Sequence, residues 1–135
     1  CSSLKEPSRK LQESEYLSKK REVSKIDEIK TYRLDKIYKK LLRVKTLIPA
    51  YLKLDIQGAE LEAIEGAGYF LKDILFIETE ISLDNNNKMY TKGSGPKELL
   101  KILDKNGFEP VLFTEYPQSP LPEGEVIFKN KKIKV

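Results

Sequence analysis

The stretch from Leu52 to Ala67, LKLDIQGAELEAIEGA, restricts the possible folds of this chain more than any other. Its apolar start predicts a buried strand that ends near Asp55. Gln57 and Gly58 indicate a tight turn, and the acidic residues after them favour the first turn of a helix. In open α/β sheets, ligands bind outside the carboxyl ends of the strands. The pattern therefore predicts an α/β protein with a ligand site beside Asp55.

Composition fits one globular domain and excludes several kinds of site. The 135 residues provide one core of moderate size, and 39% hydrophobic with 34% charged residues is typical of a folded chain. With no histidine and a single cysteine, Cys1, the chain has no imidazole base, no internal disulfide and no soft ligand set for a metal. No apolar run approaches the ~20 residues of a membrane-spanning helix. We therefore expect a cytoplasmic protein with no membrane partner and no metal.

The net charge of +4 is unevenly distributed. Residues 1–45 contain 14 Lys/Arg and 7 Asp/Glu (+7), whereas residues 46–135 contain 11 and 14 (−3). This basic arm keeps open an alternative function, a non-catalytic module that docks on nucleic acid or an acidic partner. Nucleic acid is disfavoured, because acidic residues interrupt the arm and few aromatic side chains are present for base stacking. The opening Cys1-Ser2-Ser3 leaves a third option, a lipid-bearing amino terminus.

Periodicity and turn residues predict the order of the elements. The basic arm contains a candidate strand at Ile26–Arg33 and a helix at Leu34–Val44, and Leu99, Leu100, Ile102 and Leu103 form the buried stripe of a later helix. The alternation of strands and helices predicts a mostly parallel sheet with one antiparallel strand near its C-terminal end. The elements expected after residue 46 are strands Tyr51–Ile56, Asp73–Ser82, Phe108–Tyr116 and Glu125–Asn130, a helix Ala59–Phe70, and a helix from Pro96 to the Asn106-Gly107 stop.

Three motifs follow one another along the chain: LKLDIQGAELEAIEGA, ILFIETEIS and MYTKGSGPKELLKILDKNGFEP. Together they resemble the carboxyl-terminal half of the FkbM-type methyltransferases, which use S-adenosylmethionine. The matching positions include Asp55, Gly58, Glu80 and Tyr90, while Gln57 replaces the commoner Glu. The resemblance covers about residues 2–130. It implies a partial Rossmann-like methyltransferase fold, in which residues 46–135 form the carboxyl-terminal half of the domain.

One part of the family pattern is missing from this sequence. In the family, a first strand and its glycine-rich turn hold the cofactor, but Gly93-Ser94-Gly95 follows a loop rather than a strand. We therefore expect a truncated domain or half of a split protein that is inactive alone. The edge of the strand Tyr51–Ile56 is then expected to be exposed.

The resemblance implies roles for five residues in an O-methylation of a sugar or another small metabolite. Asp55 and Glu80 are the candidate catalytic carboxylates, because a base must remove the proton of the acceptor hydroxyl. Asp55, Gln57 and Gly58 are the candidate cofactor contacts. Glu80 and Tyr90 are the candidate substrate contacts, and Glu80 is expected to lie near Asp55 across adjacent parallel strands.

Each of these side chains also has a structural interpretation. Asp55 could cap the turn at Gly58, Glu80 could be a surface carboxylate, and Tyr90 could pack beside an apolar helix. Lys53 alternates onto the face of Asp55, which predicts a structural ion pair.

Overall fold

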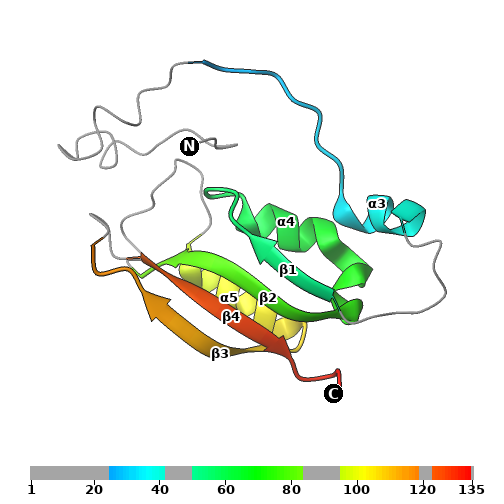
Figure 1. The fold of residues 1–135 in the computed structure, drawn as a ribbon. Coiled ribbons are helices and arrows are strands. Elements are labelled where there is room, and N and C mark those ends of the chain that lie inside the picture. The colour runs from blue at the N-terminus through cyan, green and yellow to red at the C-terminus, as the bar shows by residue number, and fades with distance from the viewer. Residues whose placement is uncertain (1–24, 42–49, 84–94, 119–122, 135) are drawn as a thin grey trace.

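A computed structural model describes residues 25–41, 50–83, 95–118 and 123–134, and it shows a sheet whose strands alternate with helices along most of the chain (Figure 1). Helices α4 and α5 pack against the sheet, while α3 lies at its side. In chain order the elements are α3 Leu34–Leu41, β1 Ala50–Leu54, α4 Glu60–Ala67, the 3₁₀ helix η1 Gly68–Asp73, β2 Ile74–Ser82, α5 Pro96–Lys105, β3 Phe108–Glu115 and β4 Glu123–Asn130.

The four described strands lie in the order β1-β2-β4-β3. β1 pairs with β2 in parallel, whereas β4 is antiparallel to both β2 and β3. The mixed α/β class agrees with the prediction, but the mostly parallel sheet does not, because only one of the three neighbouring pairs is parallel. The physical reason is that the last strand inserts between β2 and β3 rather than adding at an edge. β1, β2 and β3 consequently run in the same direction, and β1 forms an edge of this sheet.

Two other expectations need correction. Residues 26–33 form no strand; Ile26 is 83% exposed and Tyr32 65% exposed, and an extended segment becomes a strand only when a neighbour accepts its backbone hydrogen bonds. The helix predicted from Ala59 to Phe70 changes to η1 at Gly68, whose φ of 50° interrupts the α-helix. The helix from Leu34 agrees with α3 through residue 41, and its predicted end lies outside the described residues.

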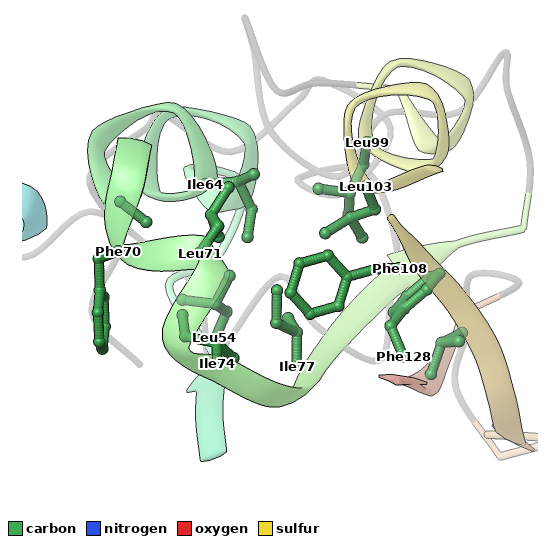
Figure 2. Packing of buried hydrophobic residues seen from close by; sticks show 12 residues of the cluster. Leu54, Ile64, Phe70, Leu71, Ile74, Ile77, Leu99, Leu103, Phe108 and Phe128 are labelled. Carbon is green, nitrogen blue, oxygen red and sulfur yellow. The ribbon is translucent and has the colours of Figure 1, made fainter. Parts of the chain in front are cut away.

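The core lies between the sheet and the two helices α4 and α5. Figure 2 shows both helices on one side of the sheet, with the buried side chains between them. In α5, Leu99 and Leu103 are buried one turn apart, whereas Leu100 is 39% exposed and does not belong to the predicted stripe. The core residues with 0% exposure are Ile64, Ala67, Ile74, Ile77 and Leu103.

Helix α3 attaches the preceding segment to the end of α4 and to η1. The ring centroids of Tyr38 and Phe70 are 3.7 Å apart, and the Tyr38 hydroxyl donates to Asp73 Oδ2 at 3.3 Å. Arg33 Nη2 donates to the Glu65 carbonyl oxygen at 3.1 Å. A cation near the last carbonyls of a helix is favourable, because these carbonyls have no partner within the helix. The predicted boundary between residues 45 and 46 lies outside the described residues and stays a prediction.

Asn130 connects the end of β4 to the start of β2. Its side chain is 1% exposed, and Nδ2 donates to the carbonyl oxygens of Leu71 at 3.2 Å and Ile74 at 3.1 Å. Its Oδ1 accepts from the backbone N–H of Lys132 at 3.0 Å. One buried amide therefore satisfies backbone groups of three segments.

We expect Asn130→Ala to lower the free energy of unfolding by about 2 kcal/mol or more, because buried carbonyl groups lose their donor. Asn130→Asp should cost at least as much, since it places an acceptor against two carbonyls. Urea unfolding measures both, with the exposed Lys134→Ala as control. A loss no larger than that of the control would contradict this role of Asn130.

Candidate functional site

The direction of the strands brings several polar side chains to one edge of the sheet. Because β1, β2 and β3 run the same way, their carboxyl ends meet at this edge. Asp55 follows β1, Glu80 lies near the end of β2, and Tyr116 follows β3. This is the edge at which open α/β sheets bind ligands.

The side chain of Gln57 connects the two predicted carboxylates. Its Nε2 donates to Asp55 Oδ1 at 2.9 Å and to Glu80 Oε2 at 3.2 Å. The structure therefore brings Asp55 and Glu80 together through one amide, on adjacent parallel strands as expected, while their roles in chemistry stay predictions. Asp55 is exposed, whereas Gln57 and Glu80 are half-buried.

The backbone at Gln57 adopts an unusual conformation. Its φ is 54°, in the left-handed region that costs roughly 1–2 kcal/mol for a residue with a side chain. Gly58 follows with a φ of 98°, and its N–H donates to Glu60 Oε1 at 3.1 Å. Glu60, rather than Asp55, therefore caps this turn. The N–H of Gly58 is thus used within the turn, where the glycine provides conformational freedom and has no side chain.

A second group of polar side chains continues from this edge over the face of the sheet opposite the helices. Lys53 contacts Glu78, its register partner on β2, and its Nζ also lies 2.9 Å from Glu125 Oε1 on β4. The Tyr51 hydroxyl donates to Glu78. The predicted ion pair of Lys53 is therefore made with Glu78 and Glu125 instead of Asp55, because the side chain extends across β2 rather than along β1.

These contacts shift the protonation equilibria of their members. Hydrogen bonds from Lys53 and Tyr51 lower the pKa of Glu78 to about 2. The hydrogen bond to Glu78, followed by burial, raises the pKa of Tyr51 to about 12. The pKa of Lys53 is raised above its usual value by its hydrogen bonds to Glu78 and Glu125. Near neutral pH Glu78 is consequently an ionised carboxylate beside the Lys53 ammonium and the neutral Tyr51 phenol.

Tyr116 belongs to the same surroundings. Burial raises its pKa first, and the negative charge of Glu125, a hydrogen bond to Glu125 and the charge of Glu80 raise it further. The sequence interpretation missed Tyr116, Glu125 and Glu78. Glu78 was detectable, since it alternates onto the face of Glu80 on one strand. Glu125 was not, because its position depends on the insertion of β4 beside β2.

Some predictions concern residues that the structure does not describe. Tyr90 lies within residues 84–94, and most of the basic arm lies within residues 1–24 and 42–49, so the substrate role of Tyr90 and the alternative binding module stay predictions. Within the described part of the chain, His, Cys, Asp and Glu side chains form no group of three that could hold a metal ion. The helices described here are all too short or too polar to span a membrane.

Comparison with known proteins identified a family. A family model described as the methyltransferase FkbM domain matches residues 2–110, more than half of the chain. This range includes Gln57 and the two carboxylates that its amide connects, Asp55 and Glu80. Neither the curated proteins nor the solved structures contained a match.

The lowered pKa of Glu78 predicts an acid-sensitive contribution to stability. A carboxyl whose pKa drops on folding, here from 4.5 to about 2, stabilises the folded state above its unfolded pKa and loses this effect as the pH falls between the two values. In Glu78→Gln this contribution is absent, so its unfolding free energy should decrease less steeply below about pH 5. Urea unfolding at several pH values tests this, with the exposed Glu109→Gln as control. Parallel curves for Glu78→Gln and the wild type would contradict it.

Two glycines next to α4 should respond differently to a methyl group. Gly58→Ala should destabilise the protein by about 1 kcal/mol or more, because its φ is 98° and alanine disfavours that region. Gly66 lies inside α4, and a Cβ there meets its nearest backbone atoms at 3.9 Å, so Gly66→Ala should be neutral or stabilising. Thermal unfolding compares the two variants, and equal losses at both positions would refute the conformational role of Gly58.

Proposed function

Because the chain belongs to the FkbM methyltransferase family, we propose that it acts in the transfer of a methyl group from S-adenosylmethionine to a hydroxyl oxygen of a sugar or another small metabolite. The observation that carries this proposal is the Gln57 amide between Asp55 and Glu80 at the carboxyl edge of the sheet. Two carboxylates oriented by one donor form an arrangement suited to binding and deprotonating hydroxyl groups.

Asp55, Gln57 and Gly58 are the residues that we assign to the cofactor. S-adenosylmethionine supplies an electrophilic methyl group on a positively charged sulfur. The exposed carboxylate of Asp55 and the carbonyl oxygen of the Gln57 amide fit the cationic and hydroxyl groups of such a molecule. Gly58 allows close approach, because it has no side chain at the turn.

Glu80 is the residue that we assign as general base. When bound, S-adenosylmethionine would supply the methyl group to the acceptor oxygen and keep the electrons of the broken carbon–sulfur bond, and Glu80 would take up the hydroxyl proton. Glu80 is half-buried whereas Asp55 is exposed, so Glu80 is the carboxylate that is better shielded from water. The Gln57 amide keeps the Glu80 carboxylate oriented between successive reactions, which lowers the cost of alignment.

We expect Glu80→Gln to lower kcat by about 10²–10⁴-fold, the usual contribution of a general base. Asp55→Asn should mainly raise KM for the cofactor. Transfer of a labelled methyl group to a panel of sugars measures both, with the exposed Glu109→Gln as control.

Since the sequence predicts a domain that is inactive alone, these variants are best made in the protein as its own gene encodes it. An unchanged kcat in Glu80→Gln would exclude this residue as the base. If the wild-type protein transfers no methyl group from S-adenosylmethionine to any acceptor, the proposed function is contradicted.

A further inference from the structure

Glu80 has an unfavourable neighbour on the adjacent strand. In the antiparallel pairing of β2 with β4, Glu80 lies directly opposite Glu125. Side chains opposite one another in such a pair have Cβ atoms about 4.5–5.5 Å apart, and like charges at this distance are destabilising. The arrangement around the candidate base therefore needs a compensating cation.

Lys53 supplies this cation from β1, the strand on the other side of β2. Its Nζ contacts Glu78 on β2 and lies 2.9 Å from Glu125 Oε1 on β4, so that one ammonium spans three neighbouring strands. The Lys53 side chain is 55% exposed, whereas those of Glu78 and Glu125 are 14% and 29% exposed. The carboxylates are thus partly shielded from water beneath the lysine, where a charge contact is stronger than on an open surface.

Glu125 extends this contact to the site. It forms a hydrogen bond with Tyr116, whose hydroxyl also experiences the charge of Glu80. The backbone N–H of Tyr116 donates to the Glu123 carbonyl oxygen at 3.0 Å, which fixes the chain at the end of β3. From Lys53, a continuous set of contacts therefore leads through Glu125 to Tyr116 and the surroundings of Glu80.

We propose that Lys53 is a positioning residue of the site, which holds Glu125 so that Glu80 keeps the orientation in which Gln57 connects it to Asp55. The consequence for catalysis rests on the proposed function, whereas the structural part can be tested without any activity. Lys53 itself touches Glu78 and Glu125 and is not assigned to a substrate or to a reacting atom.

Several titratable groups surround Glu125, and they determine the effect of removing Lys53. Glu78 and Glu80 face it from β2, and Tyr116 faces it from the end of β3. Lys129 lies four residues farther along β4, on the same face and opposite Phe76. Without Lys53, three carboxylates on two adjacent strands lose the cation that contacts two of them. We expect them to move apart, and Glu80 to leave its position beside Gln57.

The test compares Lys53→Met with Lys53→Arg and with Lys101→Met, which removes an exposed charge from α5. The readout is the NMR signal of the Gln57 side-chain amide, which reports its hydrogen bonds to Asp55 and Glu80. In Lys53→Met we expect this signal to move toward that of a free amide and to exchange several-fold faster with water. Lys53→Arg should preserve it, because a guanidinium can also contact two carboxylates, and Lys101→Met should leave it unchanged.

The pKa of Glu78 provides a second readout. In Lys53→Met it should rise from about 2 toward its ordinary value of 4.5, because the principal hydrogen bond that lowers it is lost. A raised pKa of Glu78 together with an unchanged NMR signal of the Gln57 amide would overturn the proposal, since Lys53 would then act only on its immediate partner.

The double variant Lys53→Met/Glu125→Gln keeps the proposal testable if the single variant does not fold. It removes the cation together with the like charge opposite Glu80, so the Gln57 signal should return to its wild-type position. A signal that stays displaced in the double variant would also overturn the proposal.

The failure of this inference is distinguishable from that of the proposed function. If the Gln57 amide responds as expected but no methyl transfer occurs, the positioning role holds and the function is wrong. If methyl transfer occurs and Lys53→Met leaves both kcat and the Gln57 amide unchanged, the function holds and the positioning role is wrong.

Discussion

The hydrogen bonds that β4 makes with β2 and β3 are the interaction on which the described structure depends. They place the last strand between two strands that run in the opposite direction. This position brings Val126 and Phe128 into the core and Glu125 opposite Glu80. It also lets Asn130 donate to carbonyl groups at the start of β2. Core, strand order and site geometry thus follow from the position of one strand, β4.

The two-residue period of the strands separates the core from the polar face. In β2, Ile77 and Thr79 are buried, and Figure 2 shows Ile77 on the side of the sheet that α4 and α5 cover. By the alternation of a strand, Glu78 and Glu80 lie on the other face. A shift of one residue in the register would exchange the two sets, burying carboxylates and exposing the core. The same pairing that stabilises the sheet therefore also determines which carboxylates can interact with Lys53 and Gln57.

Gln57 occupies a position at which the FkbM family more often has Glu, and this replacement changes the hydrogen bonding of the site. An amide donates hydrogen bonds, so it can connect two ionised carboxylates, whereas an ionised Glu accepts only and would add a third negative charge. The left-handed backbone at this position directs the side chain to Asp55 and Glu80. We infer that the neutral Gln57 donor offsets the repulsion between carboxylates at one end of this cluster, as the Lys53 cation does at the other.

The sequence by itself determined the α/β class, the turn at Gln57-Gly58 and the family, because these depend on local periodicity and on motifs within short stretches. It also determined that Asp55 and Glu80 approach each other, since the two residues lie at the carboxyl ends of neighbouring parallel strands. Only the tertiary structure decided that β4 lies inside the sheet, that residues 26–33 form no strand, and that Lys53 pairs with Glu78 and Glu125. The physical reason is that these features arise from contacts between segments distant in sequence, which local patterns do not record.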